Sequence, residues 1–428
     1  MEPKNKKLLF GLIFTVLILG VYRLGYFIQL PYIRMENVTA MFTSGESMFG
    51  FLDIFSGGAL SNFSIVALGV TPFITASIVT QLLQMDIVPV LKEWAEEGES
   101  GKQKINTLNK YFAIGLAFVQ ALTIVLGVSV SYNDVFFGLG TPEGTFKYVY
   151  LAIVMTAGTA FVLWLADLIT AKGIGNGTSL MIVAGIIASY PDMINDLLNS
   201  YLFVDEAGAK EILTFVGVIV LMIAIIIGVV FMEAAQRKIP IQYSNRSNAG
   251  TFRGRNDSNI PIKLNSASVI PVIFASTLMS LPTTIANFIT NTTAKNVLDA
   301  IFNTSRPIGF VVYIVLIVLF TFFYSFLQMN PEQMADNLQK QSAHIPGIRP
   351  GEETKSYISR VLFKVNVLGA TYLAILAALP IILTNLLGLP ASVQIGGTGL
   401  IIVVGVAIES WKQLKQANQE KQYRGFIG

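Results

Sequence analysis

Residues that could carry out catalysis are few in this chain of 428 residues. The chain has no cysteine, which excludes disulfides, thiol catalysis and cysteine-based metal sites, and His344 is its single histidine. An intramembrane serine protease would need a histidine or a lysine beside its serine within the bilayer. His344 lies in a polar stretch, and no apolar run holds a lysine in its core. We therefore expect no enzyme activity, no metal and no cofactor.

The stretch from Gly98 to Lys102 is similar to part of a phosphate-binding loop. It lacks the first glycine at the required spacing, follows an acidic run and does not come after a strand. Ion-coupled transport is a second possibility, which usually requires carboxylates in the middle of the membrane. Asp167, Glu233 and Glu409 fall at predicted helix ends, where we expect them to be solvated or to act as caps. Nucleotide binding and an ion relay are both disfavoured.

The composition indicates a polytopic membrane protein. The chain is 53% hydrophobic, 13% charged and has a mean hydropathy of +0.62, whereas charged residues make up about a quarter of a soluble protein. The first apolar run ends at Arg23 and Tyr26 without a small-residue cleavage pattern, so it is predicted as a first span and not a cleaved signal. Arg23 falls where it could snorkel or form an ion pair near the far side of the membrane.

Charge-free runs predict ten membrane spans. They are residues 8–28, 63–83, 105–128, 146–169, 178–198, 211–232, 266–289 and 307–327, and two more within 365–408, where Pro380, Asn385, Gly388 and Pro390 favour turns. Lysines and arginines number 23 on the side that holds the N-terminus and five on the other. This bias places both termini in the cytoplasm.

The stretch between Asp53 and Asp86 is too long for one span and contains its own breaks. Residues 55–62 include adjacent Gly57 and Gly58 and carry no ionisable group, which predicts a half-inserted segment held by small-residue packing and not by charge. Residues 63–83 are predicted as a full helix that is kinked at Pro72.

Two predicted cytoplasmic loops, residues 233–264 and 330–360, are long and polar. Basic residues alone are enough to orient a membrane protein, so the length of these loops needs another explanation. The first is expected to form a hairpin strand near 239–243, and the second to begin a helix at Pro331. Basic loops could serve orientation alone. Long structured loops between helices usually bind a partner, which is the alternative that we favour.

A channel that closes by an apolar constriction needs no charge in its helices, because a ring of branched aliphatic side chains dewets and blocks ions. Such residues cannot be chosen from the sequence alone. Several motifs, however, resemble a known family: Phe55-Ser-Gly-Gly-Ala-Leu60, Ala67-Leu-Gly-Val-Thr-Pro72, Glu97-Gly-Glu-Ser-Gly101, Asn330-Pro, Ala335-Asp-Asn-Leu338 and Pro346-Gly-Ile-Arg-Pro-Gly-Glu352. In this order they are similar to bacterial SecY, the channel subunit of the Sec translocon.

The resemblance implies an all-α polytopic fold of ten transmembrane helices in two inverted halves, residues 1–200 and 201–428, with a short plug before helix 2. It implies a lateral gate between helices 2 and 7, next to helices 3 and 8. It also implies that Ile273 faces the pore, while Val272 is expected to face outward. By this resemblance the pore ring is Val70, Ile74, Thr178, Ile182, Ile273 and Ile402; the plug is Phe55, Ser56, Gly57, Gly58, Ala59, Leu60, Ser61 and Asn62; the gate includes Thr75, Gln81, Ser276 and Thr277; and Arg253, Arg255 and Arg349 dock a motor or ribosome.

The implied partners are the SecE and SecG subunits, the SecA motor or the ribosome, signal sequences, nascent polypeptides and membrane lipid, in a bacterial plasma membrane. Thr178 departs from the family pattern, where isoleucine is common, although its β-branch is kept. Three functions remain open: a general protein-conducting channel, an accessory paralogue for a few exported proteins, and a small-molecule transporter. The complete set of motifs favours the first, and the charge-free cores disfavour the third.

Overall fold

The computed structural model describes residues 3–34, 38, 53, 55–84, 87–131, 135–136, 144–203, 209–243, 258–286, 292–389 and 391–424. Helices dominate this part of the chain. They are α1 (Pro3–Tyr26), α4 (Thr71–Leu83), α5 (Pro89–Glu96), α6 (Glu99–Ser131), α7 (Gly144–Lys172), α8 (Gly177–Tyr201), α9 (Ala209–Ala234), α10 (Ile270–Ala286), α11 (Thr292–Phe302), α12 (Pro307–Gln328), α13 (Pro331–Lys340), α14 (Glu352–Leu387) and α15 (Ala391–Arg424).

The spans follow the predicted apolar runs. Seven of the described helices are long and apolar enough to cross a membrane, and α4 and α10 are shorter apolar helices. The tenth is α15, whose first part buries Ile401 and Ile402 and whose second part is polar. The predicted ten-helix, all-α polytopic fold is confirmed.

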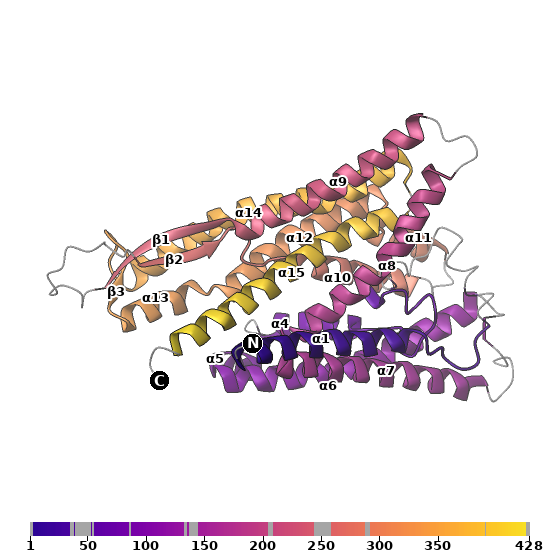
Figure 1. Cartoon of the computed structure of the whole chain (residues 1–428), viewed down its shortest axis with the longest axis horizontal. Helices are drawn as coiled ribbons and strands as arrows, with labels where there is room; N and C mark the ends of the chain where they lie inside the picture. The colour runs from indigo at the N-terminus through magenta and orange to yellow at the C-terminus, as the bar shows by residue number, and fades with distance from the viewer. Residues whose placement is uncertain are drawn as a thin grey trace.

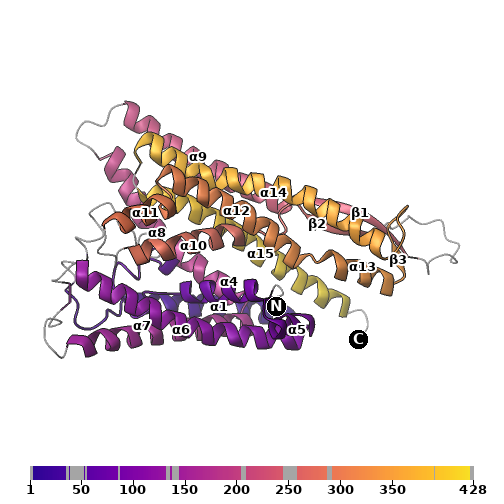
Figure 2. The same ribbon diagram turned by 180° about the vertical axis from the view of Figure 1, so that it is seen from behind.

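The helices form two groups, which contact each other through α8 and through α4 and α10. In Figures 1 and 2, α1, α4, α6 and α7 lie together on one side, and α9, α10, α12, α14 and α15 lie on the other. Helix α8 packs on α7 in the first group and on α15 and α9 in the second, and α4 contacts α10. The start of α1, the end of α15, α5 and α13 lie at the same end of the molecule (Figure 1).

The second span begins later than its apolar run predicts. Residues 57–70 form turns, and α4 starts at Thr71 with Pro72 in its first turn, so the predicted kink within a longer helix is wrong. The unwound backbone is paired with the chain after α1: Leu30 N donates to Phe63 O at 2.8 Å, and Ile65 N donates to Ile28 O at 2.9 Å. These bonds replace the helical ones that an apolar environment requires.

Helix boundaries also differ in the second half of the chain. Helix α10 begins at Ile270, four residues after the predicted start. Helix α14 continues through Pro380, so the prediction of a turn there is wrong, and the helix ends at Gly388, whose φ of 63° is left-handed. A Cβ added at Gly397 of α15 would lie 2.7 Å from the Pro380 ring, which shows that the two helices pack closely at this point.

The two long loops meet in one small sheet. Strand β1 (Gln236–Tyr243) pairs antiparallel with β2 (Ser258–Lys263), which confirms the hairpin strand, and the N-cap Asn330 starts α13 at Pro331 as predicted. A third strand, β3 (Ala343–His344), was not predicted and gives the order β2-β1-β3. Buried Ile239, Ile262, Leu338 and Ile358 join the sheet to α13 and α14.

Candidate pore constriction and plug segment

Five of the six predicted ring residues lie in one buried hydrophobic cluster at the junction of the two helix groups. They come from α4, α8, α10, α15 and the residue before α4, and they are at most 6% exposed: Val70, Ile74, Ile182, Ile273 and Ile402. Thr178 lies one turn before Ile182 and is half-buried, and its backbone N–H donates to the N-cap Asn176 Oδ1 at 3.1 Å. The structure therefore places five of the predicted residues in one larger cluster, of which Thr178 is not a member, and their role as a pore ring stays a prediction.

Val272 does not face outward as expected. Its side chain is fully buried in the same cluster as Ile273, because α10 is covered by neighbouring helices on more than one face. On this helix Leu278, which is 37% exposed, is an outward-facing residue.

The plug segment, residues 55–62, enters this cluster through Phe55 and Ala59, which are 2% and 0% exposed. Asp53 closes the segment into a compact turn. Its backbone oxygen accepts from Gly58 N at 2.8 Å, and its carboxylate Oδ1 accepts from Ser61 N at 2.7 Å. Burial raises the pKa of Asp53 to about 6, with a smaller contribution from the charge of Asp192, while the hydrogen bonds from Ser61 lower it.

Small residues allow the plug segment to lie directly on α8. Gly57 has a φ of 72°, and a Cβ added there would be 2.9 Å from Gly185 Cα. Gly185 is three residues after Ile182, so both lie on the same face of α8. On the other side, a Cβ added at Gly69 would be 3.5 Å from Ser56 Cα. The plug segment therefore packs next to the predicted ring.

Charge also holds the plug segment, which corrects the expectation of packing alone. Arg23 Nη1 on α1 donates to Gly57 O at 2.6 Å, and Tyr22 OH donates to Ser56 O at 3.2 Å. Arg23 was expected to snorkel or to form an ion pair near the far side of the membrane, whereas the structure shows it donating to a backbone carbonyl. The signal that could have identified its role is the charge itself, because an arginine within an apolar span normally has a partner.

The predicted gate residues lie on contacting helices but bond elsewhere. Thr75, Ser276 and Thr277 are buried, and α4 contacts α10. Thr75 and Thr277 donate to carbonyls of their own helices, Gln81 Nε2 donates to Ser77 Oγ at 3.1 Å, and Ser276 Oγ lies 3.2 Å from Tyr313 OH on α12. Among the described residues, none of the four forms a hydrogen bond between α4 and α10. This seam is therefore closed mainly by apolar packing.

The predicted docking arginines are described only in part. Arg349 is exposed, while its backbone is held at the start of α14: its carbonyl accepts from Thr354 Oγ1 at 2.8 Å, and its N–H donates to Glu353 Oε2 at 3.4 Å. A fixed backbone with an exposed guanidinium is suited to binding an anionic partner. Arg253 and Arg255 lie outside the described residues.

The carboxylates predicted to be solvated have mixed environments. Asp167 Oδ2 pairs with Lys110 Nζ of α6 at 2.7 Å. Glu233 is buried, at 4% exposure, so the expectation of a solvated or capping role is wrong for this residue. Ser268 Oγ donates to Glu233 Oε1 at 2.7 Å, and Lys412 Nζ donates to the Glu233 carbonyl at 2.7 Å.

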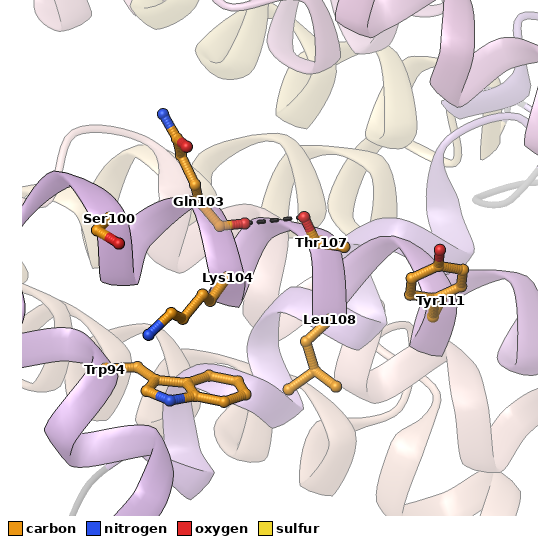
Figure 3. Close-up of a pocket in the computed structure, with 7 residues that line it drawn as sticks. All are labelled: Trp94, Ser100, Gln103, Lys104, Thr107, Leu108 and Tyr111. Carbon is orange, nitrogen blue, oxygen red and sulfur yellow. Dashed lines mark hydrogen bonds between the residues drawn. The ribbon is translucent and has the colours of Figure 1, made fainter.

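A groove of about 490 Å³ lies between α5 and α6, apart from the hydrophobic cluster (Figure 3). Trp94, Lys104 and Tyr111 line it, and Lys104 Nζ pairs with Glu97 Oε2 at 2.7 Å. The groove adjoins the stretch that is similar to a phosphate-binding loop. In that stretch, Glu99 to Lys102 form the first turn of α6 and do not follow a strand, so the geometry does not favour nucleotide binding.

Comparison with known proteins identifies the family. The SecY family model matches residues 64–411. The chain belongs to the SecY family. SecY of Bacillus licheniformis, named protein translocase subunit SecY, is 46% identical over 420 residues, which is 97% of this chain and 96% of that protein. SecY of Staphylococcus epidermidis is 44% identical over 429 residues, covering 100% and 97% of the two chains. The resemblance stated from the motifs is confirmed.

Solved structures agree with the SecY fold. A structure described as a protein conducting channel has a TM-score of 0.62 at 20% identity, and the match covers 96% of this chain and 92% of that one. Sec61 in a canine ribosome-channel complex from the endoplasmic reticulum has a TM-score of 0.61 at 19% identity, with the same coverage. These likenesses concern the fold, and the sequence relatives carry the family assignment.

Proposed function

We propose that this SecY-family chain is the general protein-conducting channel of a bacterial plasma membrane, with both termini in the cytoplasm. It would translocate unfolded secretory polypeptides and release membrane segments laterally into the lipid. The observation that carries the proposal is the buried apolar cluster at the junction of the two helix groups, with the plug segment packed against it. SecY is a family of channel subunits, and the chain is not an enzyme.

The pore ring would act by excluding water. A constriction of valine and isoleucine side chains dewets and blocks ions, and a translocating polypeptide widens it by displacing side chains. In the proposal Val70, Ile74, Ile182, Ile273 and Ile402 form this constriction. Thr178 would complete the ring at one edge with a β-branched methyl group. The plug segment would occlude the same passage until a substrate displaces it.

The lateral gate would be the seam between α4 and α10. Its predicted residues Thr75, Gln81, Ser276 and Thr277 donate or share hydrogen bonds within their own helices or toward α12, so opening the seam would break few polar contacts. The Gln81 Oε1 atom is buried and has no partner among the described residues. The apolar helix of a signal sequence could then replace the packing between the two helices. The two inverted halves, residues 1–200 and 201–428, would move apart around this seam.

The cytoplasmic partners would bind the sheet and the loops around it. A relative of similar fold is named as part of a ribosome-channel complex, and we extend this to a multisubunit translocon for the present chain. In the proposal SecE and SecG are membrane subunits. SecA or the ribosome would dock on Arg349 and on the predicted arginines Arg253 and Arg255.

Depletion of the protein in its own host tests the proposal against its alternatives. A general failure of secretion is the expected result. Loss of only one or two exported proteins would instead identify an accessory paralogue. Loss of a solute flux with normal secretion would identify a transporter. The secreted proteome and uptake of labelled solutes should be measured in the same culture, so that the three outcomes are separated directly.

A further inference from the structure

We propose that Arg23 of α1 is the latch of the plug segment. Its guanidinium would hold the segment on α8 while the channel is closed, and displacement of the segment would require this hydrogen bond to break. The inference rests on the proposed function and deepens it. It assigns a positioning residue to a helix that belongs neither to the predicted ring nor to the predicted gate.

Two consecutive side chains of α1 bind two consecutive carbonyls of the plug segment. Arg23 Nη1 donates to Gly57 O at 2.6 Å, and Tyr22 OH donates to Ser56 O at 3.2 Å. The arginine bond is short and charge-assisted, which makes it the stronger of the two. Backbone carbonyls are the acceptors, so the contact depends on the position of the segment and not on its side chains.

The Arg23 side chain also contacts an aromatic ring of its own helix. Its guanidinium carbon lies 3.9 Å from the centre of the Tyr26 ring, one helical turn further along α1. Such a cation–π contact restricts the long arginine side chain. Arg23 is half-buried in an apolar span, where a charge without a partner is unfavourable. Departure of the plug segment would therefore expose both an unsatisfied carbonyl and an unsatisfied guanidinium.

Gly57, whose carbonyl accepts the hydrogen bond from Arg23, also contacts α8. Its left-handed backbone brings it against Gly185, and a Cβ added at either glycine would lie within 3 Å of the other segment's backbone. Gly185 shares a face of α8 with Ile182 of the predicted ring. The hydrogen bond from Arg23 to the Gly57 carbonyl thus positions the plug segment beside the predicted constriction.

Accessibility of one introduced cysteine tests the latch. The chain has no cysteine of its own, and Ser56 is 2% exposed, so Ser56→Cys provides a nearly isosteric probe that is shielded while the segment is closed. Its labelling by a membrane-impermeant maleimide from the outer side should be compared in the parent, in Arg23→Gln and in Arg23→Lys. Arg306→Gln is the matched control, because Arg306 pairs with Asp299 and, within the described part of the chain, forms no bond to residues 55–62.

We expect Arg23→Gln to raise the labelling rate about tenfold, which corresponds to the loss of one charge-assisted hydrogen bond. Arg23→Lys should restore most of the protection, and Arg306→Gln should label like the parent. An unchanged rate in Arg23→Gln overturns the latch. If Arg23→Gln does not accumulate, Tyr26→Leu can be used instead, because it removes only the ring that contacts Arg23. This variant should raise the labelling rate about threefold. A parental labelling rate in Tyr26→Leu overturns the latch as well.

Ion conductance measured on the same variants separates the latch from the function on which it rests. Faster labelling together with a higher resting conductance supports both. Faster labelling with the parental conductance supports the latch and contradicts a sealing role of the plug segment. Parental labelling with normal secretion contradicts the latch and leaves the channel proposal intact.

Discussion

The carboxylate of Glu233, at the end of α9, lies 3.4 Å from the ammonium of Lys412 on α15, although 179 residues separate them in the sequence. The same lysine donates to the Glu233 backbone carbonyl, and Ser268, just before α10, donates to the carboxylate. This junction therefore ties together α9, α15 and the start of α10, at the point where β1 leaves the membrane helices.

We expect Lys412→Met to be more destabilising than Glu233→Gln. The Glu233 side chain is 2% exposed and that of Lys412 is 35% exposed, so removing the lysine leaves a buried carboxylate without its cation and with only the hydrogen bond from Ser268. The cost should be about 2–4 kcal/mol, against about 1–2 kcal/mol for the neutral glutamine, which can still accept from Ser268. Thermal unfolding of the purified complex, followed for both variants, measures the order. An equal or reversed order would contradict a buried ion pair.

Ile273→Asn should weaken the closed channel. An amide in the apolar cluster lets water wet the constriction and loosens its packing by about 1–3 kcal/mol. A signal sequence opens the channel through its higher affinity for the open state, so a defective signal would then suffice. Export of proteins with damaged signals and ion conductance are the measurements. Leu278→Asn, on the outward face of the same helix, is the control, and parental behaviour of Ile273→Asn would exclude the residue from the ring.

Arg349→Glu should abolish motor-driven translocation while the complex remains assembled. The exposed guanidinium is presented by a backbone that Thr354 and Glu353 hold in place, so the substitution reverses a charge without unfolding the loop. Translocation into proteoliposomes with SecA and ATP is the assay. Arg360→Glu, an exposed charge reversal in the third turn of α14, should have a smaller effect. Normal translocation by Arg349→Glu would refute the docking role.

Cysteines at Gln242 and His344 should form a disulfide. These residues are register partners in β1 and β3, and the pair joins the two long loops, residues 233–264 and 330–360. Because the chain has no other cysteine, a shift in gel mobility under oxidising conditions reports the pair directly. Cysteines at Lys238 and His344, which are not partners in this register, serve as the control. Equal cross-linking of both pairs would show that the third strand is not paired as described.

Lower pH on the outer side should stabilise the closed plug segment. Burial raises the pKa of Asp53 to about 6, above its ordinary value of 3.8, so the closed position favours the protonated acid. The contribution is fully present below the ordinary pKa and is lost as pH rises through about 6. Asp192, whose charge acts on Asp53, and Arg23 are the other charged groups nearby. Protection of the Ser56→Cys probe should therefore increase from pH 7.5 to 5.5, once each labelling rate is divided by that of a free thiol at the same pH, because the maleimide reacts with the thiolate. Asp53→Asn should remove this corrected dependence while keeping an acceptor for Ser61 N.

The sequence by itself determined the class of the protein, the number of spans and the family. Partition of a charge-free run into a bilayer depends on its own composition, so each span can be recognised without knowledge of its neighbours. The helix start at Pro331 and the strand near Ile239 follow equally from local residue types.

Only the tertiary structure decided where the second span starts, which face of α10 is covered and what Arg23 binds. Phe63 leaves the helix because its backbone pairs with residues that follow α1, and no local pattern encodes that pairing. Val272 is buried because a second neighbour covers its face, whereas periodicity distinguishes only apolar from polar faces and every face of a membrane helix is apolar. The bonds of Arg23 to Gly57 and of Glu233 to Lys412 join distant segments, so they exist only once the helices have packed.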